Sequence, residues 1–360
     1  MRQILYCVLI FSLFLSCEPE NNDPIYSSDY GKGIYVLTEE GVVYYDYNSP
    51  DTLKVLRENI FQTVNAHSIS SPASLKIIND DIYIVSKNTL YKVDANTFLK
   101  EMEIHGFVDA RKCENARYNR LYVSDAGVAE IKVVDLDGSY ITANIESGIN
   151  VYPNSITYNS SRSFIVNSGG ESPSDYDSTM VAVDIRDGVV PVNNFAGNVV
   201  VGKNPISILN DGAIIVLCKG VYDQNNPANN SESSIYRVGA GDLSVINVIT
   251  LNNIYNANLI IFNHNKTKYY LTSSNGIYSV DASNYNYNLV TNQKTPSSFC
   301  VHIEQYADTD TTFAYSEMLY MNDENDNSEN RFIYKYNVQL DSFVDSFPIN
   351  SKVLDIQIYK

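Results

Sequence analysis

Apolar residues recur along the chain in short runs of four to six, and a few polar residues separate each run from the next. The clearest example is the run 82–86, Ile-Tyr-Ile-Val-Ser, which is followed after a short polar loop by the run 90–94, Leu-Tyr-Lys-Val-Asp. Runs of this length, rich in β-branched and aromatic residues, are typical of β-strands, and no long window shows the periodicity of a helix. The paired pattern occurs seven times, at 34–37 with 42–46, 82–86 with 90–94, 121–124 with 131–135, 164–167 with 180–184, 214–217 with 235–238, 269–272 with 277–281 and 318–321 with 332–336.

The seven copies repeat at the spacing of a four-stranded propeller blade. Equivalent positions are 48, 39, 43, 50, 55 and 50 residues apart, counted along Tyr35, Tyr83, Tyr122, Ile165, Ile215, Tyr270 and Tyr320. Another apolar run precedes most copies, and Pro-x-Ser or a variant often introduces it, at 72–74, 153–155, 205–207 and 296–298. A fourth run, such as 98–104, follows each copy. We therefore predict an all-β fold, a seven-bladed β-propeller with four antiparallel strands per blade.

The two ends of the repeat region predict how the ring closes. The first copy lacks an innermost strand of its own, while an unpaired apolar run, 353–359, ends the chain. If this C-terminal strand joins the first blade, no long inner edge is left exposed. We expect this closure.

The first 16 residues have the features of an export signal. A short basic segment, Met-Arg-Gln, precedes an apolar run of 13 residues, 4–16, which is shorter than the roughly 20 residues that span a bilayer. Cys17 follows directly, and the acidic, Asn-rich segment 18–23 comes next. The segment 14–17, Phe-Leu-Ser-Cys, resembles a bacterial lipobox, which implies a signal peptide at 1–16 and diacylation of the Cys17 thiol. The alternative is a plain secretory signal in which Cys17 is incidental.

On the lipobox interpretation, residues 17–30 are the lipidated cysteine and a flexible acidic tether, and residues 31–360 are the propeller. An acidic segment directly after the lipidated cysteine also resembles the signal that exports lipoproteins of the Bacteroidetes. The expected location is the outer membrane, where the lipid anchors the protein and the propeller faces the cell exterior.

Composition and cysteine spacing remove several classes of function. The chain has 25 Lys and Arg against 42 Asp and Glu, a net charge of −17 at pH 7. Nucleic-acid partners are therefore not expected, because phosphates require a clustered cationic surface. There is no Trp, which excludes the WD form of propeller. The propeller cysteines, Cys113, Cys218 and Cys300, lack C-x-x-C spacing, and we expect them to be buried apolar residues rather than disulfide partners or zinc ligands.

The repeats at 82–94 and 121–136 resemble those of YVTN-type, YncE-like seven-bladed propellers. Together with the lipobox and the acidic segment, they make the chain similar to the surface-lipoprotein branch of that family in Bacteroidetes, over residues 31–360. This resemblance implies an accessory lipoprotein of a TonB-dependent outer-membrane transporter. One class of member captures corrinoids, and others are associated with uptake of iron–siderophores. The chain departs from the repeat at 239–241 and at Asn337, where the family has Asp, and we interpret both as turn changes.

In each blade, the loop between the second and third strands and the loop that enters the innermost strand lie on the same face. Three such loops are long, at 169–179, 219–233 and 322–331, and long loops in compact domains often carry function. Tyr and Asn side chains suit a large polar ligand such as a corrinoid, a siderophore or a glycan. The candidate ligand-binding residues are Tyr176, Tyr222, Asp223, Asn225 and Asn226, with Arg111, Asn154, Asn204 and Asn258 around the channel mouth.

No catalytic or metal-binding motif accompanies these residues. The four histidines, at 67, 105, 264 and 302, have no metal-ligand spacing, and no G-x-S-x-G, P-loop or G-x-G-x-x-G motif occurs, so we expect no metal, cofactor or catalytic residue. The acidic loop 322–329 has oxygen ligands that calcium prefers but lacks the EF-hand spacing, and a solvated loop is the simpler interpretation. Nutrient capture for a transporter is the leading function. The alternatives are a cell-surface protein-interaction or adhesion module and, third, a propeller hydrolase or lyase.

Overall fold

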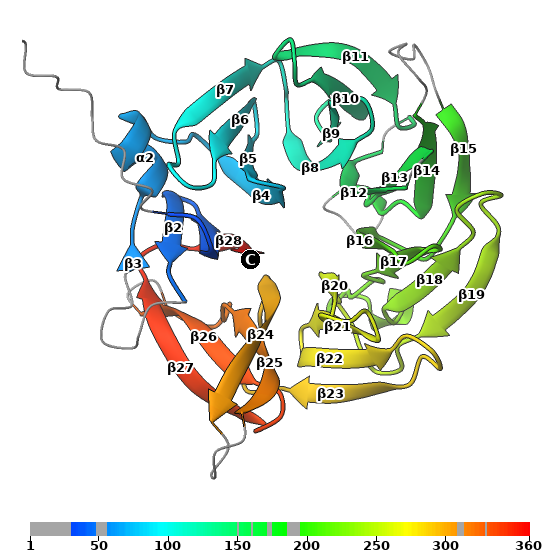
Figure 1. Ribbon diagram of the computed structural model, residues 1–360. Helices are drawn as coiled ribbons and strands as arrows, with labels where there is room; N and C mark the ends of the chain where they lie inside the picture. The colour runs from blue at the N-terminus through cyan, green and yellow to red at the C-terminus, as the bar shows by residue number, and fades with distance from the viewer. Residues whose placement is uncertain are drawn as a thin grey trace, which may run out of the picture.

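The computed structural model describes residues 30–47, 56–149, 151–159, 161–170, 175–185, 195–307, 313–327 and 330–360. Its strands form seven antiparallel sheets of four, and the sheets stand as blades around a central channel (Figure 1). The chain is therefore a seven-bladed β-propeller, and the prediction of the fold is confirmed.

Blades 2 to 7 each use four consecutive strands, ordered from the channel outward as the chain runs. Blade 2 holds β4 (Pro72–Ile78), β5 (Asp81–Ser86), β6 (Thr89–Asp94) and β7 (Lys100–His105); blade 3 holds β8 (Ala110–Ala116), β9 (Arg120–Asp125), β10 (Glu130–Asp135) and β11 (Tyr140–Glu146); blade 4 holds β12 (Pro153–Tyr158), β13 (Arg162–Asn167), β14 (Thr179–Asp184) and β15 (Phe195–Val200). Blade 5 holds β16 (Pro205–Asn210), β17 (Ile214–Cys218), β18 (Ser234–Val238) and β19 (Val245–Thr250); blade 6 holds β20 (Ile260–Phe262), β21 (Lys268–Ser273), β22 (Gly276–Asp281) and β23 (Tyr287–Thr291); blade 7 holds β24 (Phe299–Ala307), β25 (Phe313–Met321), β26 (Arg331–Asn337) and β27 (Ser342–Ile349).

Blade 1 joins the two ends of the chain. Its innermost strand is β28 (Val353–Tyr359), followed by β1 (Gly33–Thr38), β2 (Gly41–Tyr45) and the two-residue β3 (Leu56–Arg57). Strands β28 and β1 are antiparallel and place Ile356 opposite Val36. The predicted closure by the C-terminal strand is confirmed, and every strand of the ring lies between residues 33 and 359.

The second strand of each blade is largely buried because both of its faces contact neighbouring blades. All six residues of β1 and all five of β17 are buried, which explains the continuous apolar runs in the sequence. Three of the four predicted Pro-x-Ser motifs begin an innermost strand, at Pro72, Pro153 and Pro205. The fourth differs, since β24 begins at Phe299 and Pro296 lies in the preceding loop.

The Asp that ends many third strands organises the turn to the outer strand. In blade 2, the Asp94 carboxylate accepts the backbone N–H groups of Asn96 and Thr97 at 3.0 and 2.8 Å. In blade 7, the Asn337 amide oxygen accepts two backbone N–H groups in the same way, each at 3.0 Å. The substitution of Asn for Asp is therefore a turn change without loss of the turn.

One short helix, α2 (Ile60–Asn65), lies between β3 and β4, and no periodicity of the sequence predicts it. Its buried residues Ile60 and Phe61 contribute to the apolar cluster between blades 1 and 2. Asn65 joins it to blade 2 by accepting the backbone N–H of Lys100 at 2.8 Å. The helix covers the edge of the blade whose outer strand is shortest.

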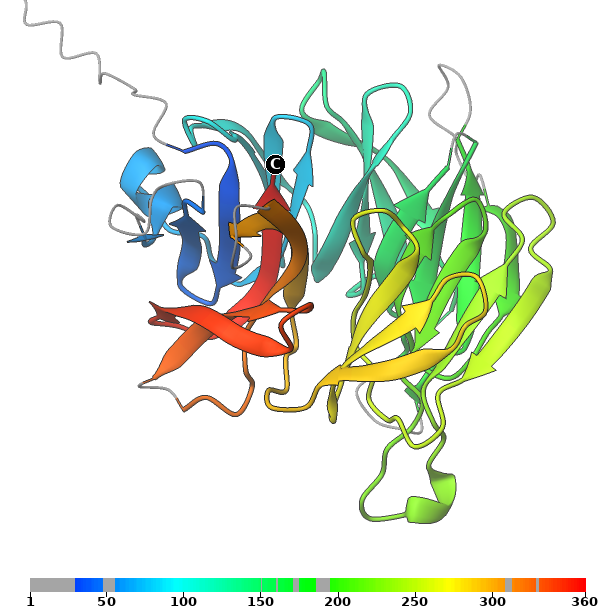
Figure 2. The ribbon, with the colours of Figure 1, turned by 60° about the horizontal axis from the view of Figure 1, so that its bottom comes forward.

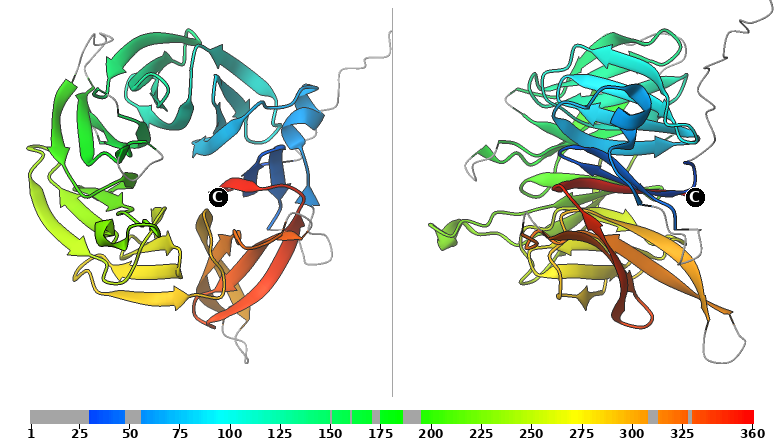
Figure 3. Two further views of the ribbon diagram at one scale, coloured as in Figure 1. Left: turned by 180° about the vertical axis from the view of Figure 1, so that it is seen from behind. Right: turned by 90° about the vertical axis from the view of Figure 1, so that its left-hand side faces the viewer.

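The two faces of the ring differ. The described chain begins at Tyr30 on one face, and the loop between β17 and β18 extends from the opposite face (Figures 2 and 3). Tyr30 itself was predicted to end the tether, but its ring contacts the rings of Tyr44 and Phe98, with centroids 5.4 and 5.7 Å away. It therefore belongs to the propeller. The predicted signal peptide 1–16, Cys17 and the rest of the tether lie outside the described residues. No helix in the part of the chain that the structure describes is long and apolar enough to cross a membrane.

Deletion of residues 351–360 should strongly destabilise the ring. It removes β28 with its buried Val353 and Ile356, and burial of two such side chains contributes about 4 kcal/mol, a large part of the roughly 5 to 15 kcal/mol that stabilises a domain. We expect a thermal unfolding scan to show a large decrease in melting temperature. Deletion of Lys360 alone, which follows β28, is the control. An unchanged melting temperature for the longer deletion would contradict the closed ring.

Candidate functional site

The long loops gather on one face of the propeller, which we call the loop face. It consists of the loops between the second and third strands of each blade and the loops that lead into the innermost strands. The loops 168–178, 219–233 and 322–330, in blades 4, 5 and 7, are much longer than the two-residue turns 39–40, 87–88 and 274–275 in blades 1, 2 and 6. The loop 219–233 extends furthest, and it contains the short helix η2 (Pro227–Asn229) (Figure 2).

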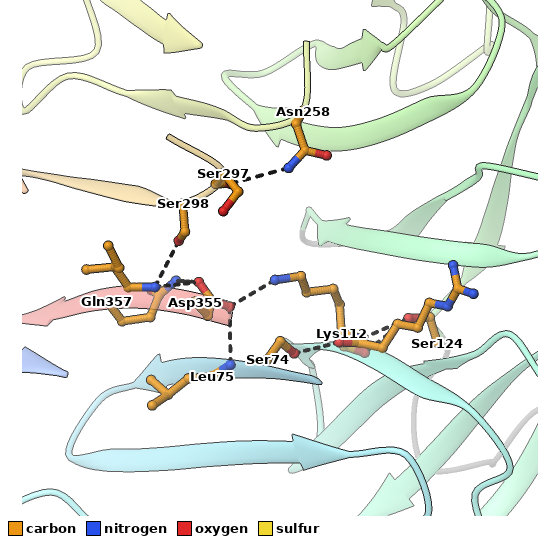
Figure 4. Close-up of polar contacts among 11 residues, drawn as sticks. Ser74, Leu75, Lys112, Ser124, Asn258, Ser297, Ser298, Asp355 and Gln357 are labelled. Carbon is orange, nitrogen blue, oxygen red and sulfur yellow. Dashed lines mark hydrogen bonds and ion pairs between the residues drawn. The ribbon is translucent and has the colours of Figure 1, made fainter. Parts of the chain in front are cut away.

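Asp355 forms the centre of a polar network near the loop-face end of the channel (Figure 4). Asp355 is buried, with 4% of its surface exposed. Its Oδ2 accepts the backbone N–H of Leu75, in blade 2, at 3.2 Å and the Lys112 ammonium, in blade 3, at 2.9 Å. Asp355 therefore joins the closing strand to the next two blades.

Hydroxyl groups make the equivalent contacts between other neighbouring blades. Ser74 Oγ donates to the Arg111 carbonyl at 2.6 Å, Ser207 Oγ accepts the Ile260 N–H at 3.3 Å, and Ser298 Oγ accepts the Ile356 N–H at 3.0 Å. The three serines come from Pro-x-Ser motifs. The motif therefore supplies a side chain that joins one innermost strand to the next.

Further along the channel lies a cavity of about 330 Å³ that the innermost strands line with both polar and apolar side chains. Lys76 Nζ lies 2.6 Å from Glu114 Oε2 within this lining. Burial acts to lower the pKa of Lys76, but the Glu114 carboxylate raises it more, and the net pKa is above the ordinary value. Because these charges are paired within the protein, the channel presents little net charge to a ligand.

Of the residues predicted around the channel mouth, Arg111 has the best-defined neighbours. Its Nη2 lies 3.2 Å from Asp109 Oδ2, and its guanidinium carbon lies 5.9 Å from the centre of the Tyr152 ring. Asn258 Nδ2 donates to the Ser297 carbonyl at 3.3 Å (Figure 4). Asn154 is half-buried at the second position of β12.

Asn204 has a structural role rather than an exposed one. It is 6% exposed, with a positive φ of 53°. Its backbone donates to the Asp177 carbonyl and accepts the Lys219 N–H, each at 2.8 Å. It thus joins the loop that enters blade 5 to the long loops of blades 4 and 5. Tyr176, which precedes Asp177 in the loop of blade 4, is half-buried.

The candidates in the blade 5 loop separate into two groups. Tyr222 is exposed, and its ring centroid lies 5.6 Å from that of Tyr255, which the loop 251–259 of blade 6 supplies. Asp223 instead stabilises its own loop, because its carboxylate accepts the backbone N–H groups of Asn225 and Asn226 at 2.9 and 3.2 Å. Both Asn residues are exposed on the extended part of the loop.

The ammonium group of Lys294 lies among the carboxylates of the acidic loop of blade 7. Lys294 Nζ lies 3.2 Å from Asp323 Oδ2, 4.0 Å from Asp326 Oδ1 and 3.8 Å from the centre of the Tyr334 ring. Burial acts to lower the pKa of Lys294, but Tyr334 and Asp323 raise it above its ordinary value. The most buried carboxylates of this loop are therefore paired with a lysine rather than solvated, and they line a cavity of about 340 Å³ with Arg331 and Lys352.

The three propeller cysteines and His302 have the surroundings of structural residues. Cys113, Cys218 and Cys300 are free and buried, as predicted, and burial raises the pKa of each thiol to about 12. Burial also lowers the pKa of His302 to about 4, so its imidazole is neutral at pH 7. Among the residues described, no group of three or more His, Cys, Asp or Glu is arranged to hold a metal ion.

The predicted candidates therefore share a face but do not form a single pocket. Arg111 with Tyr152, Tyr222 with Tyr255, and Asn258 with Ser297 are three separate pairs around the channel. Tyr152 was not among the predicted candidates, although it precedes Pro153 of a Pro-x-Ser motif. Tyr255 and Lys294, which lie in loops that enter innermost strands, were not among them either.

Comparison with known proteins supports the fold. No protein-family model matches the chain, and no curated protein is similar to it in sequence. Similar solved structures include a candidate 6-phosphogluconolactonase from Bacteroides fragilis NCTC 9343, with 10% sequence identity and a TM-score of 0.64 over 93% of this chain and 99% of that one. Another candidate 6-phosphogluconolactonase, from Bacteroides uniformis ATCC 8492, has 10% identity and a TM-score of 0.64 over 91% and 99% of the two chains.

A quinoprotein alcohol dehydrogenase-like protein from Bacteroides thetaiotaomicron VPI-5482 is also similar, with 13% identity and a TM-score of 0.59 over 91% of this chain and 75% of that one. At these identities the likeness extends to the fold alone. This chain is thus a propeller whose structural neighbours include propellers from Bacteroides.

Replacement of Lys294 by Met should destabilise the protein by about 2 kcal/mol, because it leaves the poorly exposed Asp323 and Asp326 carboxylates without their cation. Lys87→Met, which changes an exposed lysine on the same face, is the control.

The melting temperature of the unmodified protein should be the same in EDTA and in millimolar calcium, since Lys294 already pairs with the Asp323 and Asp326 carboxylates. A calcium-dependent rise of several degrees would show that the loop binds the ion.

Proposed function

We propose that the chain is an outer-membrane lipoprotein, of the surface branch of YncE-like propellers, that captures a nutrient ligand on its loop face and passes it to a TonB-dependent transporter. The observation that supports this function most strongly is the opposite placement of the long loops and of Tyr30 (Figure 3). Cys17 precedes Tyr30 by 13 residues. An anchor at Cys17 would attach to the propeller on the face where β1 begins, which leaves the loop face free of the attachment.

The side chains of the loop face support capture of a large ligand with both polar and apolar parts. The Tyr222–Tyr255 and Arg111–Tyr152 pairs offer ring surfaces, and Asn258 and the backbone of the loops offer hydrogen-bonding groups. Tyr and Arg are the residue types that contribute most at binding surfaces. A ligand of the corrinoid, siderophore or glycan class has the size to contact several of these groups at once.

A second function, a cell-surface protein-interaction module, is favoured by a different observation. The outer strands β15 and β19 contain no charged residue. They expose Phe195, Val200, Ile246 and Val248. An uncharged outer edge with exposed apolar side chains is available to pair with a strand of another protein.

The direct test of capture is a thermal-shift screen of the fragment 24–360, which contains every strand of the ring. The screen uses corrinoids, haem, ferric siderophores and glycans. A ligand at 100 times its dissociation constant adds about 2.7 kcal/mol of stability, so we expect one class to raise the melting temperature by several degrees. If no class shifts it, the protein-interaction function is favoured instead.

Lipid anchoring is tested separately in cells. We expect the full chain to incorporate radiolabelled palmitate and to be digested by protease added to intact cells, and the Cys17→Ala variant to lose the label and leave the membrane fraction. Cys113→Ala is the matched control, because that thiol is buried in the propeller. A labelled Cys17→Ala variant would contradict anchoring at this residue.

A further inference from the structure

A cavity on the loop face lies between blades 3 and 4. It has a volume of about 740 Å³, within the range of sites for drug-sized ligands. Its lining consists of residues 126–130 and 146 of blade 3, residues 148, 149, 151 and 152 between β11 and β12, and Asp175 of blade 4.

One part of the lining is apolar and open to solvent. Val128, Ile149 and Tyr152 line the cavity and are exposed, and Ile149 is 90% exposed. Val151 also lines the cavity but is buried. Exposed Val108 extends this surface, since a Cβ placed on Gly127 would lie only 2.6 Å from Val108 Cγ1. Contiguous exposed apolar residues of this kind mark binding surfaces.

The charged part of the lining is entirely acidic among the described residues. Three carboxylates, from Glu130, Glu146 and Asp175, line the cavity, and no Lys or Arg does. Strands β10 and β11 place Glu130 and Glu146 directly opposite each other. An anionic ligand would therefore be repelled.

Two cations beside the lining are already paired with carboxylates of the protein. Arg111, beside Tyr152, pairs with Asp109 at 3.2 Å, and Lys132 pairs with Glu130 at 2.5 Å. Glu146 is exposed and has no ion-pair partner among the residues that the structure describes. The negative charge at Glu146 is thus left for a ligand beside the apolar surface.

From this geometry we infer that the cavity between blades 3 and 4 binds an organic cation that carries an apolar body. The Glu146 carboxylate and the Tyr152 ring, which line the same cavity, both attract the cationic nitrogen. The apolar body contacts the exposed Val128 and Ile149. The chemistry is the same for a whole small molecule and for an amine-bearing arm of a larger nutrient. The inference rests on the proposed function only in that the loop face binds ligands.

Three matched probes test the class of ligand: 4-phenylbutylammonium, 4-phenylbutanol and 4-phenylbutyrate. They share an apolar body and differ in charge. Calorimetry and ligand-observed NMR with the fragment 24–360 should give binding of the ammonium about tenfold tighter than of the alcohol and no detectable binding of the carboxylate. High salt should weaken only the ammonium. Equal binding of the three probes, or no binding of the ammonium at millimolar concentration, would overturn the inference.

Variants locate the site. Glu146→Gln should remove most of the advantage of the ammonium over the alcohol, and Tyr152→Ala should weaken both. Two matched controls change the same residue types elsewhere: Glu39→Gln lies on the loop face in the exposed turn of blade 1, and Tyr140→Ala changes an exposed tyrosine at the other end of β11. Unchanged probe affinities in Glu146→Gln and Tyr152→Ala would place binding elsewhere and overturn the assignment.

The outcomes also separate this inference from the proposed function. If the probes bind as expected while no nutrient class shifts the melting temperature, the cavity has the inferred chemistry and nutrient capture is wrong. If a nutrient binds with the same affinity to the unmodified protein and to Glu146→Gln, and the ammonium probe does not bind, capture stands and this inference is wrong.

Discussion

The pairing of β28 with β1 is the constraint on which the rest of the molecule depends. It makes the first and last segments of the chain one blade, and it places Asp355 where it can hold Leu75 and Lys112 of the next two blades. Ser298 completes the other side of this junction through Ile356. Because a propeller without closure has two exposed sheet edges, the position of every loop around the channel depends on this contact.

Closure also decides which loops can act together. The innermost strands all run in the same direction along the channel, so the loops that enter them share one face with the turns between second and third strands. The long loops of blades 4, 5 and 7 therefore surround one channel mouth, although they lie far apart in the sequence. Tyr30 lies on the other face (Figure 3), and this opposition links the fold to the proposed capture of a ligand away from a membrane.

The repeat in the sequence was sufficient to predict the fold, because the buried strands of a propeller are short, apolar and regularly spaced. The helix α2 could not be predicted, since six residues are too few to show a helical period. The surroundings of the candidate residues could not be predicted in the same way. The sequence assigns a residue to a loop but does not show how that loop packs against the loops of other blades. The buried Asn204 therefore could not be distinguished from the exposed Tyr222. Partners supplied by another blade, such as Tyr255, were missed for the same reason.

Hydrogen exchange of the C-terminal strand tests the central claim, that closure by β28 is part of the global structure. Mass spectrometry would compare a peptide covering 353–359 with one covering 205–210, the innermost strand of blade 5. If β28 opens only when the whole ring unfolds, both peptides exchange with the same free energy. Exchange of 353–359 at a much lower free energy, while 205–210 stays protected, would show that β28 frays locally and would contradict the account.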